Sequence, residues 1–111
     1  MPSGDRAEAR ICAPTQLGTS TTTLVTVPAG QTYICKQILI CNTDTVDRTV
    51  TLAIGSAATA SNRIISALPI GANDIIVLDT ALLLLTTETL QGLSDVASKV
   101  NVTIVGIDKT N

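Results

Sequence analysis

Short runs of alternating apolar and polar residues, separated by Pro, Gly, Asn or Ser, recur along the whole chain. The clearest run is Arg48 to Ile54, in which Val50, Leu52 and Ile54 would point to one face and Thr49, Thr51 and Ala53 to the other. A repeat of two residues is that of a half-buried antiparallel β-strand. No stretch of ten or more residues has the 3.6-residue repeat of a helix, so the sequence predicts an all-β fold.

About eight strands are predicted, at a spacing of about 8–12 residues, which is typical of an antiparallel β-sandwich or a jelly-roll-like fold. The predicted strands are 11–13, 22–27, 31–42, 48–54, 63–67, 73–78, 89–93 and 99–107. The apolar run 82–85 fits a helix or a strand equally well. Pro28 to Gly30 predicts a tight reversal, and the last two strands are expected to form a closing hairpin around residues 94–98.

The 111 residues correspond to one domain. We expect a flexible N-terminal arm over residues 1–10, which is either a frayed tail or a segment that orders only against a partner, and a single β-sandwich domain over residues 11–111. Apolar residues make up 45% of the chain but aromatic residues only 1%, with Tyr33 alone. The core must therefore be built from Val, Ile, Leu and Ala, and the β-branched members of that set favour strands.

The predicted strand Gln31 to Asn42 is apolar on both faces, whereas a strand in an isolated sandwich has one wet face. By simple alternation, one face carries Tyr33, Cys35, Leu39 and Cys41, and the other carries Ile34, Ile38 and Ile40. Two explanations stay open. Either the strand contains a local bulge or lies under a loop, or one of its faces packs on another subunit.

The chain has no histidine, which removes the usual general base, the Ser-His and Cys-His pairs, and the mixed Cys/His zinc sites. No Walker loop or dinucleotide fingerprint is present. Leu78-Asp79-Thr80-Ala81 is similar to the Asp-Thr-Gly turn of retroviral-type aspartic proteases, but Ala81 replaces the glycine. We expect an ordinary strand end with Asp79 in a turn. The chain is predicted not to be an enzyme, with no catalytic, cofactor-binding or metal-binding residues and no cofactor.

Asn42, Asp44 and Asp47 lie in one polar loop and raise the question of a calcium site. Their spacing does not fit an EF-hand loop, and Arg48 adjoins them. We therefore predict an Asx-type turn at this loop.

The net charge is −2, and the seven Lys and Arg residues are scattered rather than gathered in a stripe. Nucleic-acid and membrane partners are therefore not expected. The N-terminus lacks the apolar middle of a secretory signal, so the protein is expected to stay or be assembled in the cell that made it. The three cysteines, Cys12, Cys35 and Cys41, are predicted to be reduced. Cys35 and Cys41 would be about 20 Å apart in one extended strand, beyond bridging distance.

Six segments of the sequence resemble small β-sandwich virion proteins of tailed phages. They are Val27 to Tyr33, Ile38 to Thr43, Arg48 to Leu52, Leu68 to Asn73, Val77 to Asp79 and Val100 to Ile104. Among these proteins, the chain is most similar to the capsid decoration type, called cement or staple, of epsilon15-like phages. The resemblance extends from about Thr22 to Ile107. It implies a jelly-roll-like fold and symmetric oligomers seated on a shell, and it brings no catalytic residues.

The expected function is therefore that of a structural virion protein, which decorates and stabilises a phage capsid by clamping neighbouring capsid subunits. Its partners would be the major capsid protein and itself, with a homodimer on local two-fold axes as the first expectation and a trimer as the second. It would lie on the outer capsid surface and be assembled in the host cytoplasm. The alternative is a receptor- or carbohydrate-binding β-sandwich module of a tail or fibre, although Tyr33 is the only aromatic residue that could support a sugar.

Overall fold

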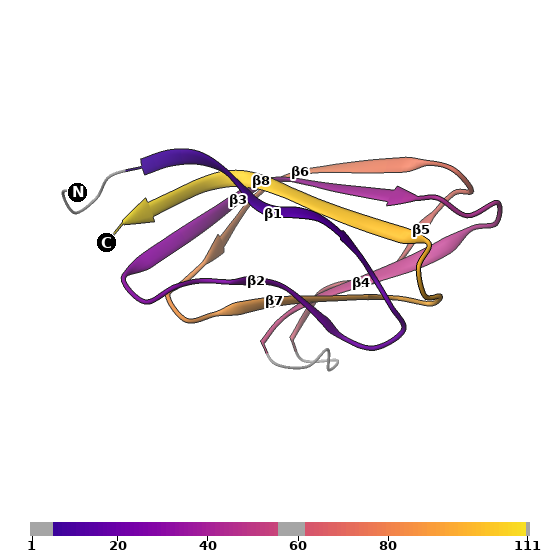
Figure 1. Cartoon of the computed structure of the whole chain (residues 1–111), viewed down its shortest axis with the longest axis horizontal. Coiled ribbons are helices and arrows are strands. Elements are labelled where there is room, and N and C mark those ends of the chain that lie inside the picture. Colours follow the sequence, from indigo (N-terminus) through magenta and orange to yellow (C-terminus); the bar gives the residue numbers. More distant parts are fainter. Residues whose placement is uncertain (1–5, 56–61, 111) are drawn as a thin grey trace.

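The computed structural model describes residues 6–55 and 62–110, which form eight strands (Figure 1). In chain order these are β1 (Arg6–Gln16), β2 (Thr22–Thr26), β3 (Gln31–Asn42), β4 (Arg48–Ile54), β5 (Arg63–Ile70), β6 (Ile75–Leu84), β7 (Thr89–Ser94) and β8 (Val100–Thr110). None of the described residues is helical, so none belongs to a helix that could cross a membrane. The predicted all-β class is confirmed.

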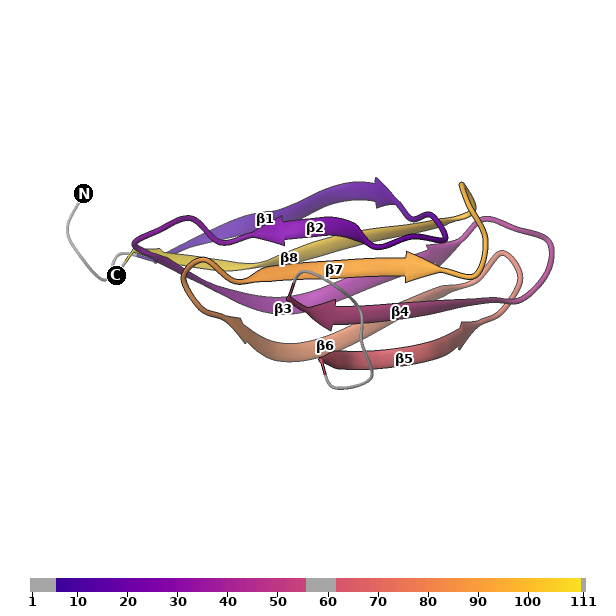
Figure 2. The ribbon, with the colours of Figure 1, turned by 90° about the horizontal axis from the view of Figure 1, so that it is seen from below.

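The strands form two four-stranded antiparallel sheets. Sheet A has the strand order β1-β8-β3-β6, and sheet B has the order β2-β7-β4-β5. Figure 1 shows the two sheets as layers of a sandwich, and Figure 2 looks onto sheet B with sheet A behind it. Consecutive strands alternate between the sheets, except β4 and β5, which are neighbours in sheet B. Eight strands connected in this way make a jelly roll, as predicted.

The predicted closing hairpin of the last two strands is wrong. Strand β7 belongs to sheet B, where it pairs with β2 and β4, and β8 belongs to sheet A, where it pairs with β1 and β3. Residues 95–99 therefore cross from one sheet to the other. A polar loop of this length permits a hairpin or a crossing equally, and the choice depends on which neighbours bury the apolar face of each strand.

Several strands are longer than their sequence patterns predicted. Residues 75–78 and 82–84 of two separate predicted segments belong to one strand, β6, so most of the ambiguous apolar run is β-structure. Strand β5 continues through Pro69 to Ile70, which is tolerated because β5 is an edge strand and Pro needs no partner for its missing N–H. The reversal at Pro28 is confirmed: Gln31 N donates to Pro28 O at 3.2 Å, and Gly30 has a φ of 81°.

Strand β1 begins inside the segment that we predicted to be an arm. Arg6 to Ala9 pair in register with Lys109 to Gly106 at the end of β8. Residues 1–5 lie outside the described part of the chain. That this end orders on a partner stays a prediction.

The core lies between the two sheets and consists of aliphatic side chains and two cysteines. Its fully buried large members are Leu17, Val27, Ile38, Ile40, Val50, Leu52, Ile70, Leu84, Leu90, Val100, Val102 and Ile104. Gly92 makes room for this packing, since a Cβ there would be 2.9 Å from Leu24 Cδ1 and 3.1 Å from Leu52 Cδ2. An interior of this kind is close-packed, so even a small change in side-chain volume affects the stability of the protein.

Strand β4 is more deeply buried than its alternation predicted. Thr51 and Ala53, on the face opposite Val50 and Leu52, are also buried. The Thr51 hydroxyl accepts a hydrogen bond from Ala67 N at 3.1 Å, which brings the backbone of β5 over this face. The alternation gave the direction of each side chain correctly, but cover from a neighbouring strand is a tertiary effect that alternation does not encode.

Candidate interaction surface

A bulge at Lys36 decides which side chains of β3 face the core. The register of β3 shifts between Cys35 and Gln37 against both of its neighbours, β6 and β8. Cys35 is buried before the shift, and Ile38 and Ile40 are buried after it. The predicted face assignment is therefore wrong, because one extra residue sends every later side chain to the opposite face. Of the two explanations left open, the bulge is present, but it does not remove the second apolar face.

Gly106 on β8 allows the bulge to fit. A Cβ at this position would collide with the carbonyl oxygen of Ile34 and lie 3.0 Å from Lys36 N. The backbone of β8 therefore lies directly against the bulged backbone of β3, and any side chain would push the two strands apart.

The outward side chains of β6, β3 and β8 form a largely apolar surface, which we call the sheet A outer face. On β6 and just after it, Ile75, Val77, Leu83 and Leu85 are 53, 46, 50 and 52% exposed. Strand β3 adds Ile34, Leu39 and Cys41, and β8 adds Val105 and Ile107, all half-buried and none of them part of the core cluster. In the described part of the chain, no element covers this face.

A hollow lined by both charged and apolar residues lies in the middle of this face, at the bulge. It has a volume of about 620 Å³ and is lined by Arg10, Lys36, Gln37, Asp79, Val105, Gly106 and Ile107. Gln37 Nε2 donates a hydrogen bond to Asp79 Oδ1 at 3.0 Å. Within residues 6–55 and 62–110, neither Arg10 nor Lys36 forms an ion pair. The hollow thus combines two unpaired positive charges with one negative charge.

Asp79 lies inside β6 and not in a turn, so the predicted strand end at this position is wrong. It pairs in register with Gln37, and its side chain points to the outer face. The residues after it, Thr80 and Ala81, lie opposite the bulge and continue the strand. In the sequence, a polar residue such as Asp79 resembles the end of a strand, because its cross-strand partner Gln37 cannot be identified there.

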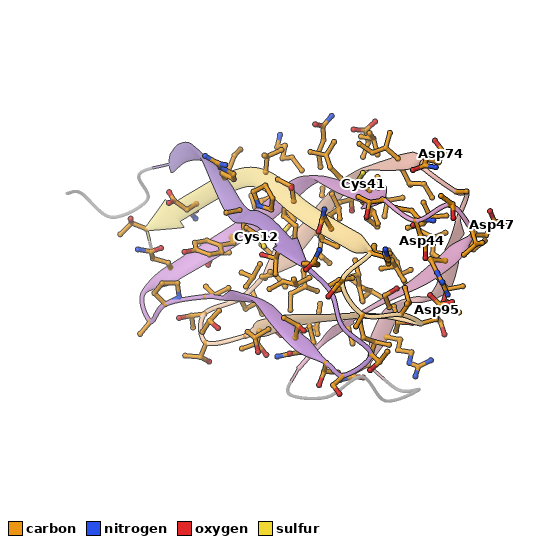
Figure 3. The ribbon with its side chains drawn as sticks, turned by 45° about the vertical axis from the view of Figure 1, so that its right-hand side comes forward. Cys12, Cys41, Asp44, Asp47, Asp74 and Asp95 are labelled. Carbon is orange, nitrogen blue, oxygen red and sulfur yellow. The ribbon has the colours of Figure 1, made fainter. Side chains whose placement is uncertain are left out.

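Four aspartates gather at the end of the sandwich where the loops after β3, β5 and β7 meet (Figure 3). Arg48 Nη2 lies 2.8 Å from Asp44 Oδ2, and Arg48 Nη1 lies 3.9 Å from Asp95 Oδ2. Hydrogen bonds from Arg48 and from Thr45 N hold the pKa of Asp44 below its usual value. Asp47 accepts from Ala72 N at 3.1 Å. Asp47 and Asp95 therefore tie the loop after β3 and the start of β4 to the loops after β5 and β7.

The loop after β3 contains the predicted Asx turn. Asn42 is fully buried, and its Oδ1 accepts a hydrogen bond from Asp44 N at 2.9 Å. Its amide nitrogen donates to the carbonyl oxygens of Val46, Ile70 and Gly71 at 3.0–3.1 Å. Among the described residues, no three His, Cys, Asp or Glu side chains are placed to hold a metal ion.

The three cysteines are free thiols in two environments. Cys12 and Cys35 are buried between the sheets, and burial, with a smaller effect of Cys12, raises the pKa of Cys35 to about 11. Cys41 is half-buried on the outer side of β3. Figure 3 shows Cys12 on β1 and Cys41 on β3. Because of the bulge, Cys35 and Cys41 project to opposite faces of the same strand.

Comparison with known proteins finds no matching family model and no match among curated proteins. Solved structures are similar in fold at low sequence identity. One is a subunit of Bacillus endospore appendages, which form disulfide-linked pili. It is 11% identical, has a TM-score of 0.57, and the match covers 98% of this chain and 91% of that one. The jelly-roll arrangement of nearly the whole chain is therefore shared with a pilus subunit.

Two viral structures are similar over most of this chain but over less of their own length. A pentameric capsid protein from metagenomic phage sequences is 20% identical, with a TM-score of 0.39, and the match covers 90% of this chain and 60% of that one. A protein in the structure of infectious bursal disease virus, Gx strain, is 11% identical, with a TM-score of 0.45, over 94% of this chain and 30% of that one.

Proposed function

We propose that this protein is a structural virion protein that decorates a phage capsid and stabilises it by clamping neighbouring capsid subunits. The observation that carries the proposal is the sheet A outer face, where four large apolar side chains on and just after the edge strand β6 are about half exposed. Contiguous apolar patches on a soluble protein mark contact sites for other proteins. In this proposal the partners are the major capsid protein and further copies of the chain, on the outer surface of a virion assembled in the host cytoplasm.

The proposed mechanism needs contact and no chemistry. Each copy binds only the assembled shell, so binding stabilises that state relative to free subunits. Many symmetry-related copies act together, and weak individual contacts then add up through avidity.

The position of Tyr33 disfavours the alternative of a carbohydrate-binding module. Sugar-binding modules present aromatic rings as platforms, and Tyr33 is the only aromatic residue in the sequence. It is half-buried and packs against the core, which leaves no exposed ring to stack on a sugar.

A second candidate function is that of a filament subunit. The likeness to the endospore appendage subunit favours it, since that match covers nearly the whole of both chains. Both candidates are structural roles and differ in the product: a coated shell in one, an open fibre in the other.

The test compares shells of the same virus assembled with and without this protein, by following their disruption during heating. The proposal predicts that shells carrying the protein break at a higher temperature. Equal disruption temperatures would contradict it. Electron microscopy of the protein alone checks the second candidate, which predicts long fibres at high concentration.

A further inference from the structure

The charges on the sheet A outer face are arranged for a second copy of the same chain. We propose that two copies pack with these faces together, related by a two-fold axis that runs nearly parallel to the strands between β3 and β8. The inference rests on the proposed structural role, because it names the partner of that same surface.

The register places charges of opposite sign at the two ends of one row across sheet A. Asp79 on β6 pairs with Gln37 on β3, and Gln37 pairs with Val105 on β8. On β1, Arg10 lies between Ala9 and Cys12, whose partners are Gly106 and Ile104, so Arg10 is beside Val105. The row therefore begins with a carboxylate on one edge strand and ends with a guanidinium on the other.

These charges select the direction of the axis. A two-fold axis parallel to the strands exchanges β6 with β1 and β3 with β8 between the copies. Asp79 of each copy then lies over Arg10 of the other, so the complementary pair forms twice. An axis across the strands would instead place Asp79 over Asp79, where like charges repel.

The apolar side chains follow the same exchange. Ile34 pairs in register with Ile107, and both point to the outer face, so the axis stacks Ile34 of each copy on Ile107 of the other. Packed sheets of this kind lie about 10 Å apart with strands crossing at about 30°. This contact would cover the half-exposed side chains of β6.

The size of the face suits a stable dimer. Four strands about 4.8 Å apart and about ten residues long at 3.3 Å per residue give a projected area of about 600 Å². The accessible area of a corrugated face exceeds its projection, and a standard interface buries about 800 Å² on each partner. The arrangement also brings the aspartate-rich loops of both copies to the same end of the axis, as a clamp on two neighbouring subunits requires.

Charge reversal tests the pairing by sedimentation velocity over a range of concentrations. The wild-type protein should reach twice its monomer mass of 11.5 kDa. Asp79→Arg alone and Arg10→Asp alone should each weaken dimerisation by on the order of tenfold or more. The double variant Asp79→Arg/Arg10→Asp should restore it to near the wild-type level. A monomeric wild-type protein, or a double variant as weak as the single ones, would overturn the inference.

A matched pair of valines checks the face itself. Val77 on β6 and Val46 in the loop after β3 are 46 and 49% exposed, and only Val77 lies on the outer face. Val77→Asp should abolish the dimer and Val46→Asp should leave it intact, with circular dichroism confirming that both variants are folded. A dimer that survives Val77→Asp would show that another surface is used.

The oligomeric state of the wild-type protein and its effect on shells together separate this inference from the proposed function. A wild-type protein that stays monomeric and still raises the disruption temperature of the shell overturns the dimer alone. A wild-type dimer that leaves the disruption temperature unchanged overturns the decorating function alone.

Discussion

The shape of the sheet A outer face depends on Gly106. Because this residue has no side chain, the bulged backbone of β3 fits against β8. Gly106→Ala should destabilise the protein by about 3 kcal/mol or more, since the new methyl group meets the backbone of Ile34, which cannot move aside as a side chain would. Urea unfolding measures the change. Gly18→Ala is the control, because a Cβ there meets nothing within 4 Å, and its effect should stay within about 0.5 kcal/mol.

Asp44 makes the stability depend on pH in a defined direction. Its pKa is lowered in the folded state, first by the hydrogen bond from Arg48 and then by that from Thr45 N. The stabilisation is therefore fully present above the unfolded pKa of about 3.9 and is lost as the pH falls through the folded value. The urea midpoint of the wild-type protein should fall below about pH 4, and that of Asp44→Asn should fall less steeply. If the urea midpoints of the two proteins fell equally steeply with pH, the ionisation of Asp44 would not contribute to the pH dependence of stability.

Among the strands, periodicity predicted most positions correctly. It missed the bulge and the extra strand length that depend on pairing with neighbouring strands. The bounds of β3 and β4 agree with the alternating patterns, and Pro28 and Gly30 correctly mark the turn before β3. The bulge at Lys36 could not be placed, because both faces of β3 are apolar and either register satisfies the pattern. The extra length of β1 and β6 comes from pairing with β8 and β3, which the sequence does not reveal.

Two adjacent leucines of β6 test whether the run 82–85 is strand. Leu84 is fully buried and Leu83 is 50% exposed, so they point to opposite faces. Leu84→Ala should cost about 2–5 kcal/mol of unfolding free energy, from lost burial and the cavity left behind. Leu83→Ala should cost less than about 0.5 kcal/mol when measured on the monomer. Similar losses from both substitutions would contradict the alternation that points Leu84 into the core and Leu83 to the outer side of β6.

For the whole molecule, the apolar residues on two sides of β3 correctly indicated a second apolar face, and the packing of that face on another subunit stays a prediction. The charged row from Asp79 to Arg10 could not be predicted, because it joins residues 69 positions apart through the strand order of sheet A. The separation of β7 and β8 into different sheets was missed for the same reason. Local patterns assign strands, whereas strand order depends on how all eight bury one common core.

The alkylation rate of the Cys41 thiol measures whether the sheet A outer face is covered in the native protein. In the proposed dimer it lies over Asn101 of the second copy, since β3 and β8 exchange places and these two residues pair in register. Alkylation of Cys41 should slow as the protein concentration rises, while buried Cys12 and Cys35 react slowly throughout. In the Arg10→Asp variant, the Cys41 rate should fall only at protein concentrations about tenfold higher or more. A wild-type rate that is equally constant would contradict the packing of this face on a second copy.

The proposed function requires that this jelly roll attaches to a phage shell, and its binding to that shell can be measured. Shells assembled from the major capsid protein of the same virus are sedimented after addition of increasing amounts of this protein, and the bound copies are counted. We expect saturation at a fixed number of copies per shell, set by the shell's symmetry. Protein that stays in the supernatant at every concentration, or that sediments without the shell as fibres, would contradict it.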